Sequence, residues 1–493
     1  MRSANHLAEV SVSTTVAAAV TCVCLLVGQS RAASNARRPV SPVRPAGPRI
    51  LYGAKAGLVF GPRRIARPAG SVKVTPDQNL QQVIASHPDG TVFWLTAGVY
   101  TNGVTNIMAK PMALVGEKGA IIDGRGANAF FLMCDGGPSS LANVTVQNLE
   151  VRGFMPPMQT AAINIPDTDG GMNRALEPEN GIHHLWTIRN CSFHDNRIGL
   201  FAGPGTLVQG CSFVHNTMVG AKACGAHVTY SGCLFRDNQG EDGGIGEHGG
   251  IKVWNTRDLL MENCVFERNE QVGFWADHAY GNNVVRHCTF RNHPKGGVEV
   301  ELTASAEVSY CLFEGNSARG GDQWIDGQAF AFNAPVHFHH NKMVGRGGWV
   351  LQNGTRFWPD GPNPTPTCEG SVVEYNDVTM TAGYSGAYCI TADAIQTPEY
   401  YKRFLGWSRE AGGDGTPPGF KADHNVYRGS GYESNRGTNN QFDDKKLRFV
   451  YGFPLERAQA DDPRSWTAWR YMGWDDYRRL TPHDAHSRLV PSK

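Results

Sequence analysis

The chain has almost no net charge. Its 46 Lys and Arg are balanced by 45 Asp and Glu, and charged residues make up only 18% of the 493 residues. A chain with so little excess charge has no broad field that attracts polyanions. This composition argues against nucleic acid and against an anionic membrane surface as partners.

The chain also lacks an apolar run long enough to cross a membrane, which takes about 20 residues. The apolar stretch Val16–Val27 spans 12 residues, follows the positive charge of Arg2 and precedes the small residues Ala32 and Ala33. This order is typical of an export signal. We predict a cleaved signal peptide over residues 1–33 and a protein that is secreted, periplasmic or on the cell surface; an uncleaved N-terminal anchor is the alternative.

Residues 34–71 are rich in Pro and Arg and show little apolar periodicity. Such a composition is typical of an extended chain without a packed core. It predicts a disordered spacer.

No two cysteines have the CxxC spacing of a metal cluster. Cysteine instead recurs in a pattern with Phe two residues later, and residues two apart share one face of a strand, here the core face. The six copies are Asn190-Cys191-Ser192-Phe193, Gly210-Cys211-Ser212-Phe213, Gly232-Cys233-Leu234-Phe235, Asn263-Cys264-Val265-Phe266, His287-Cys288-Thr289-Phe290 and Tyr310-Cys311-Leu312-Phe313. Weaker copies are Leu149/Val151, Asn341/Met343, Asn376/Val378 and Asn425/Tyr427. Successive cysteines are 20, 22, 31, 24 and 23 residues apart by subtraction, the length of one β-helical coil.

An asparagine ends nearly every copy. These residues are Asn196, Asn216, Asn238, Asn269, Asn292 and Asn316. Identical amides stacked about 4.8 Å apart can hydrogen-bond as a ladder. A β-sandwich would place its turns about 8 to 12 residues apart and needs no stacking of like upon like. We therefore predict an all-β fold, a single-stranded right-handed parallel β-helix over residues 72–450.

The ten cysteines after the signal could form disulfides in an exported protein. Side chains stacked on neighbouring coils point in parallel directions, which is a poor geometry for an S–S bond. We predict mostly free, buried thiols.

The open ends of a solenoid need covers. Thr75-Pro76-Asp77-Gln78 has the spacing of a capping box, and Leu80, Val83 and Ile84 form an apolar stripe after it. These residues predict an N-terminal helical cap. Residues 451–493, with their several tryptophans, predict a C-terminal cover or tail.

Four strands entered through glycine can be aligned: Gly220–Cys224, Gly250–Trp254, Gly273–Asp277 and Gly297–Glu301. The first and third residues after each glycine are apolar or small and face the core, so the second and fourth face outward. One outward column therefore contains Lys222, Lys252, Trp275 and Glu299. The next column contains Cys224, Trp254, Asp277 and Glu301.

These columns place lysines, carboxylates and tryptophans on one sheet face that we expect to be exposed. Solubility is a sufficient explanation for the charged residues on such a face. Exposed Trp254 and Trp275, however, serve solubility poorly and offer flat apolar surfaces to a sugar ring. An inserted loop that ends in Glu247 and His248, together with His278, is expected at the rim of this cluster.

With these residues, the chain resembles the right-handed β-helix repeat proteins of the pectate-lyase-like superfamily over about residues 72–450. Leu95–Tyr100 and Ile121–Gly124 look like the first coils of that superfamily. A narrower likeness is to exported members with three motifs on successive coils, here Glu247 with Lys252, Trp275 with Asp277, and Glu301. The resemblance implies the fold. That subgroup has no settled reaction, and the chain lacks both the calcium and arginine pattern of pectate lyases and the full aspartate set of polygalacturonases.

The first hypothesis for function is a glycoside hydrolase that cleaves an extracellular polysaccharide. Hydrolysis needs one protonated carboxyl and one carboxylate. Crowding raises the pKa of one carboxyl in such a group, and we assign Glu301 as the acid, Asp277 as its partner and Glu247 as a third candidate. Lys252 would hold an anionic substituent.

Two alternatives use the same residues. A polysaccharide lyase or uronate C5-epimerase would take Lys252 or His278 as base, and Lys222 or a Ca²⁺ ion on the two carboxylates would stabilise the developing charge. A non-catalytic solenoid that binds glycans or has a structural role at a surface is the third reading. We assign no metal ligand and no certain cofactor, and expect a monomer with a polysaccharide or other glycan as partner. The predicted substrate-binding residues are Trp254, Trp275, Lys222, Glu299, His248 and His278, beside the catalytic candidates Asp277, Glu301, Glu247 and Lys252.

Overall fold

A computed structural model describes residues 50–134, 143–165, 186–240, 249–316, 327–352, 368–382, 420–429, 449–451, 470–472, 474–480 and 483–491. All of them lie in the unit Ile50–Lys493. The predicted signal peptide and the first part of the predicted spacer lie outside these residues. None of the helices in the described part is long and apolar enough to cross a membrane.

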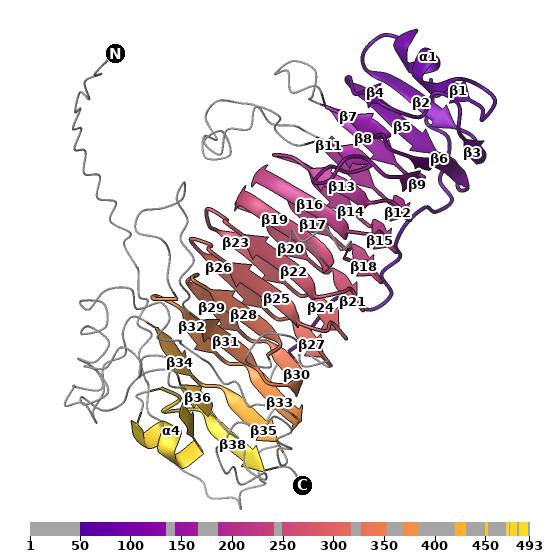
Figure 1. The fold of residues 1–493 in the computed structure, drawn as a ribbon. Helices are drawn as coiled ribbons and strands as arrows, with labels where there is room; N and C mark the ends of the chain where they lie inside the picture. The colour runs from indigo at the N-terminus through magenta and orange to yellow at the C-terminus, as the bar shows by residue number, and fades with distance from the viewer. Residues whose placement is uncertain are drawn as a thin grey trace, which may run out of the picture. The chain divides into compact units, whose positions relative to one another are not determined.

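The strands form three parallel sheets (Figure 1). Each coil of the chain contributes strands to these sheets in turn, and each strand pairs with the corresponding strand of the coil before it. Sheet A contains β1 (Val72–Val74), β2 (Thr91–Leu95), β5 (Met112–Gly116), β8 (Val144–Gln147), β11 (Trp186–Arg189), β14 (Leu207–Gln209), β17 (Thr229–Ser231), β20 (Leu260–Glu262), β23 (Asn283–Arg286), β26 (Ala306–Ser309), β29 (Val336–His339), β32 (Val372–Glu374) and β34 (Lys421–Asp423). Sheet B contains β3 (Gly98–Tyr100), β6 (Ala120–Ala127), β9 (Glu150–Phe154), β12 (Ser192–His194), β15 (Ser212–Val214), β18 (Leu234–Arg236), β21 (Val265–Glu267), β24 (Thr289–Arg291), β27 (Leu312–Glu314), β30 (Lys342–Arg346), β33 (Asp377–Ala382), β35 (Val426–Gly429) and β38 (Arg488–Pro491). Sheet C contains β4 (Ile107–Met108), β7 (Leu132–Met133), β10 (Ile163–Asn164), β13 (Ile198–Ala202), β16 (Val219–Ala226), β19 (Gly249–Arg257), β22 (Val272–Asp277), β25 (Gly296–Glu301), β28 (Ala329–Phe332) and β31 (Trp349–Gln352). The other described elements are α1 (Leu80–Ala85), α4 (Trp474–Leu480) and the antiparallel pair β36 (Phe449–Tyr451) and β37 (Arg470–Met472).

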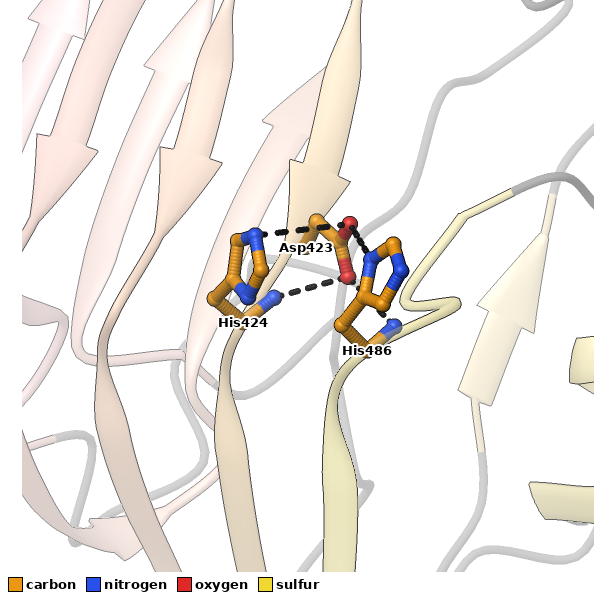
Figure 2. A group of neighbouring side chains, drawn as sticks. All are labelled: Asp423, His424 and His486. Atoms are coloured by element: carbon orange, nitrogen blue, oxygen red, sulfur yellow. Dashed lines mark hydrogen bonds and ion pairs between the residues drawn. The ribbon is translucent and has the colours of Figure 1, made fainter. Parts of the chain in front are cut away.

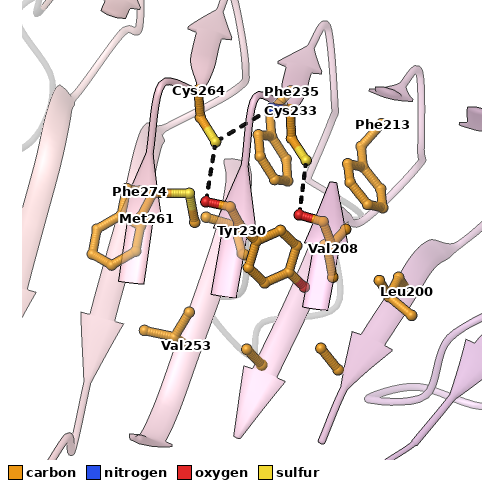
Figure 3. Packing of buried hydrophobic residues seen from close by; sticks show 14 of the residues in the cluster. Leu200, Val208, Phe213, Tyr230, Cys233, Phe235, Val253, Met261, Cys264 and Phe274 are labelled. Atoms are coloured by element: carbon orange, nitrogen blue, oxygen red, sulfur yellow. Dashed lines mark hydrogen bonds between the residues drawn. The ribbon is translucent and has the colours of Figure 1, made fainter. Parts of the chain in front are cut away.

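The predicted Cys and Phe pattern lines the core along sheet B. Six phenylalanine rings stack with centroids 4.6 to 5.1 Å apart: Phe193, Phe213, Phe235, Phe266, Phe290 and Phe313. Figure 3 shows two of these rings, Phe213 and Phe235, with Cys233 and Cys264 beside them. Each offset-stacked pair adds about 0.5–1.5 kcal/mol beyond the apolar area it buries.

The nine cysteines in the described residues are free and buried, which confirms the prediction for them. The sulfurs of seven of them contact carbonyl groups of the preceding coil; the Sγ of Cys211, for example, donates to the carbonyl of Ile188 at 3.5 Å. Burial raises the pKa of Cys211 and Cys264 well above the ordinary value. These side chains therefore act as small apolar core residues.

A ladder of buried side chains runs beside the phenylalanine stack, with the rungs Asn196, Asn216, Asn238, Asn269, His293 and Asn316. Nδ2 of Asn238 donates to Oδ1 of Asn269 at 2.8 Å. The prediction is wrong at one rung, because Asn292 occupies the turn with a φ of 58° and His293 takes the ladder position. Nδ1 of His293 lies 3.2 Å from the backbone N of Asn269. Burial lowers the pKa of His293 to about 4, so its ring stays neutral and can accept this hydrogen bond.

Three of the four weaker copies, those at Asn341, Asn376 and Asn425, carry asparagine where the stronger ones carry cysteine. Oδ1 of Asn341 accepts from the backbone N–H of Cys311 at 2.9 Å, and its Nδ2 donates to Asn376 at 3.0 Å. The Phe column continues in register through Met343, Val378 and Tyr427. These copies are therefore coils of the same solenoid.

The helix α1 begins later than the capping-box pattern predicts. Asn79 is its N-cap and accepts from the backbone N–H of Gln82 at 3.0 Å, while Thr75 and Gln78 form a separate turn. Leu80 and Ile84 are buried in the main core. The role of α1 as a cap stays a prediction.

The tail contributes to the solenoid itself. Its strand β38 pairs in parallel with β35, so sheet B extends beyond the predicted boundary at residue 450. Among the described residues of the tail, Asp484 is fully buried and accepts from the hydroxyl of Tyr427 at 3.1 Å. A hydrogen bond of this kind ties the tail to the last coils.

Residues 50–71 differ from the predicted disordered spacer. They extend along the outside of the coils, shown in indigo in Figure 1. The backbone N–H groups of Gly53 and Gly61 donate to the carbonyls of Tyr310 and Gly210, each at 2.8 Å. The composition correctly indicates that this segment has no core of its own. Its backbone is ordered because its N–H groups donate hydrogen bonds to the corners of the coils.

Replacing Asn238 by Ala should lower the free energy of unfolding by at least about 2 kcal/mol, because it leaves the buried N–H of Asn216 and C=O of Phe213 without their partner. Urea denaturation followed by circular dichroism measures the change. Gln209→Ala, at an exposed position of β14, is the matched control and should change stability by less than about 0.5 kcal/mol. A loss no larger than the control's would mean that the ladder does not stabilise the coils.

Candidate functional site

The two outward columns lie in the register that the sequence predicts. On sheet C, one column pairs Lys222, Lys252, Trp275 and Glu299 in that order. The next pairs Trp254, Asp277 and Glu301. Cys224 is the exception, because the register between β16 and β19 shifts after Ala223. We call the side chains of Lys252, Trp275, Asp277, His278 and Glu301 the column site.

The prediction that this face is exposed is wrong for four of its five charged groups, all but Glu299. Lys222 is fully buried, and Lys252, Asp277 and Glu301 are only 7%, 8% and 6% exposed. They point away from the core, but other parts of the chain cover them. Gln159, for example, accepts a hydrogen bond from the ammonium of Lys222. Buried charges need partners, because leaving water without compensation costs several kcal/mol.

Asp277 has two cationic or polar partners. Its Oδ2 lies 3.0 Å from Nζ of Lys252, and its Oδ1 lies 2.5 Å from Nδ1 of His278. Burial by itself would raise the pKa of Asp277, but the hydrogen bond from His278 and the charge of Lys252 outweigh it and hold the pKa below the ordinary value. Asp277 is therefore a carboxylate at neutral pH.

Glu301 has a different partner, although it lies directly beside Asp277 on the next coil. Its Oε2 accepts a hydrogen bond from Nε1 of Trp275 at 3.1 Å. The same indole ring lies 3.8 Å below the ammonium of Lys252. Asp277 thus has a cation beside it, and Glu301 has among its contacts the indole N–H of Trp275.

The tryptophans are less open than a sugar platform would be. Lys222 lies 4.0 Å from the ring centre of Trp254, and Phe201 packs against that ring edge to face at 5.2 Å. Lys252 covers Trp275 in the same way. Cation–π contacts of this kind stabilise the lysines by about 1–2 kcal/mol when desolvated. One face of each indole is therefore occupied from within the protein.

Sequence reasoning missed Phe201 and Gln159. Phe201 pairs in register with Lys222, and its strand, Gly199-Leu200-Phe201-Ala202, has the same glycine-led pattern as the four aligned strands. The alignment could have been extended by one coil to include it. Gln159 lies in an insertion without periodicity, which gives no signal.

Two predicted residues, Glu247 and His248, lie outside the described residues. Glu299 is half-buried and in register between Trp275 and Phe330. A calcium ion held by Asp277 and Glu301 is disfavoured in this arrangement, because Lys252 already neutralises Asp277. The role of each residue stays a prediction.

Lys252→Met should lower the free energy of unfolding by about 3 kcal/mol at pH 7, since it leaves the buried carboxylate of Asp277 without its cation. The pKa of Asp277 is lower in the folded protein than in the unfolded chain, so its ionised form stabilises the native state above about pH 4. This stabilisation is lost as the pH falls through the folded-state pKa of Asp277. Without Lys252 the pKa of Asp277 rises, so the variant's deficit should shrink between pH 7 and pH ~4.5.

Urea midpoints at the two pH values measure this difference. The control is Lys73→Met, at an exposed position of β1. A deficit that is equal at both pH values would contradict the pairing of Lys252 with Asp277.

Comparison with known proteins identifies the handedness of the coils. Residues 178–353 match the family model described as the right handed beta helix region. None of the curated proteins compared with the chain matches it.

Several solved structures are similar in part. The catalytic domain of a GH87 α-1,3-glucanase variant in complex with tetrasaccharides is 10% identical, with a TM-score of 0.38, and the match covers 68% of this chain and 66% of that domain. A mannuronic acid specific polysaccharide family 6 lyase from human gut microbiota is 11% identical, with a TM-score of 0.37 and coverage of 75% and 88%. The A-module of a mannuronan C-5 epimerase from Azotobacter vinelandii is 13% identical, with a TM-score of 0.30 and coverage of 61% and 89%. The family match and the three parallel sheets together show that this chain is a right-handed parallel β-helix.

Proposed function

We propose that this chain is an exported carbohydrate-active protein and that the column site is a glycoside hydrolase site. The observation that carries the proposal is the pairing of Asp277 with Glu301 on adjacent strands of one sheet face. Hydrolysis of a glycosidic bond uses two carboxyl groups in different protonation states. In this proposal the charge of Lys252 keeps Asp277 ionised, while Glu301, which accepts from the indole of Trp275, is the protonated group.

Asp277 acts as the nucleophile or base in this proposal, because Lys252 and His278 keep it ionised. Glu301 donates the proton to the leaving oxygen. Residues paired on neighbouring parallel strands lie about 4.8 Å apart along the backbone, so their carboxyl groups can lie close enough to act on one glycosidic bond. The stereochemical outcome depends on the separation of the carboxyl groups and stays open.

The partly exposed residues of the site provide the approach for a sugar. Trp275 and Glu299 are half-buried, and the side chain of His278 is 33% exposed. Lys252, beside them, would attract an anionic substituent on the polymer. The substrate in this proposal is an extracellular polysaccharide.

A polysaccharide lyase or a uronate C5-epimerase is the second candidate, and the contact between His278 and Asp277 favours it. A carboxylate oxygen close to Nδ1, here at 2.5 Å, orients an imidazole and leaves Nε2 to take a proton. Lys252 would then stabilise the charge that develops on the uronate carboxyl group. A surface solenoid that only binds glycans would use the same residues without turnover.

Purified protein should be incubated with a panel of neutral and acidic polysaccharides while new reducing ends and ultraviolet absorbance are both measured. A hydrolase produces reducing ends without absorbance, whereas β-elimination produces an absorbing unsaturated sugar. Glu301→Gln and Asp277→Asn should each lower turnover by about 10²–10⁴-fold, because each removes a group that transfers a proton or attacks the sugar. Normal turnover in both variants would rule out the site.

The matched control is Glu314→Gln, since Glu314 lies on sheet B and pairs with Arg291 at 2.6 Å away from the column site. It should retain turnover. Saturable binding without any turnover across the panel would instead support the non-catalytic solenoid.

A further inference from the structure

A second group of polar side chains lies on the late coils, outside the column site. Asp423 ends β34, His424 follows it at the corner, and His486 comes from the tail. Figure 2 shows the two imidazole rings on either side of the carboxylate. One ligand atom from each of the three residues lies within 4.8 Å of the other two.

The carboxylate of Asp423 is held in one orientation. Its Oδ1 accepts from the backbone N–H groups of His424 at 2.8 Å and of His486 at 2.7 Å. Its Oδ2 is left facing the rings, 2.7 Å from Nδ1 of His486 and 3.8 Å from Nε2 of His424. Backbone donors on one oxygen that aim the other are a common support for a metal-binding carboxylate.

The rings are held as well. The ring of His424 stacks on Tyr375 at 4.8 Å with an angle of 1° between their planes, and on His486 at 5.1 Å. Asp423 is nearly buried, whereas the side chain of His486 is 69% exposed. An ion can therefore reach the group from solvent.

The geometry points to a metal site, and we propose that Asp423, His424 and His486 bind a divalent transition metal ion, with Zn²⁺ the best match. Zn²⁺ takes imidazole nitrogen and carboxylate oxygen at about 2.0–2.2 Å, so tetrahedral ligands lie roughly 3.4 Å apart. The two contacts of Oδ2, at 2.7 and 3.8 Å, bracket this separation. Small rotations of the two imidazoles bring the ligands to an ion, and water completes the shell.

Binding requires a change of tautomer at His486. The proton on Nδ1, which faces Oδ2 of Asp423, moves through solvent to Nε2, so that the neutral ring offers the lone pair of Nδ1 to the ion. The ion would then join β34 to the tail segment that leads into β38. In this position the ion would hold the tail against the last coils. Its ligands lie on sheet A and at the corner that follows it, whereas the column site lies on sheet C.

Isothermal titration of chelator-treated protein without a histidine tag should show Zn²⁺ binding with a stoichiometry near one. His424→Ala and His486→Ala should each weaken the affinity at least about tenfold, because each removes one of three protein ligands. Both variants keep the backbone bonds to Asp423, so circular dichroism should show an intact fold. The control is His227→Ala: His227 lies 3.8 Å from Asp258, as His424 does from Asp423, but belongs to no three-ligand group in the described residues.

Two further measurements separate a site from nonspecific binding. Zn²⁺ should raise the unfolding temperature of the wild type and of the His227→Ala variant, but not of the two site variants. Co²⁺ should give visible absorption of a low-coordinate centre only where both histidines are present. No binding to the wild type, or equal binding to all variants, would overturn the proposal, and either result leaves the polysaccharide assay unaffected.

Discussion

The register between successive coils is the constraint on which the site depends. Side chains alternate between the faces of a strand, so a shift of one coil by a single residue would exchange its inward and outward sets. The phenylalanine stack and the asparagine ladder both require like upon like, and both oppose such a shift. Residues inside the solenoid thereby fix the pairing of Asp277 with Glu301 outside it.

The outer columns of sheet C bury charge, which is costly. A buried ion pair contributes less to stability than well-packed apolar residues of similar volume often would, so stability alone does not explain Lys252 and Asp277 at these positions. The indole of Trp275 adds a cation–π contact to Lys252 and a hydrogen bond to Glu301, and so connects both partners in one network. Networks of this kind hold orientation and protonation state, the properties that a catalytic group needs.

Strand faces and register could be predicted because they repeat. The period of two placed Asp277 and Glu301 outside the core, and the steps between cysteines placed them on adjacent coils. What the sequence could not show is what covers a strand, since the cover comes from segments without a period, such as the loop with Gln159. The ladder prediction failed at Asn292 because it followed residue type instead of position: Asn292 has the positive φ that Arg268 has one coil earlier, and His293 takes the position of Asn269.

The corner between sheets A and B connects the two chain ends to the solenoid. Each coil turns there through a residue with positive φ, which costs a residue other than glycine about 1–2 kcal/mol. Early coils place Asn or Gly at this corner, and residues 50–71 bind to it through hydrogen bonds. Later coils place rings there, and these stack in the order His287, Tyr310, His340, Tyr375 and His424. The ring of His486, from the tail, continues the stack beyond His424. Stacking offsets the backbone strain, and because the last two rings are imidazoles beside a fixed carboxylate, the same column that shapes each turn ends in a group suited to a metal ion.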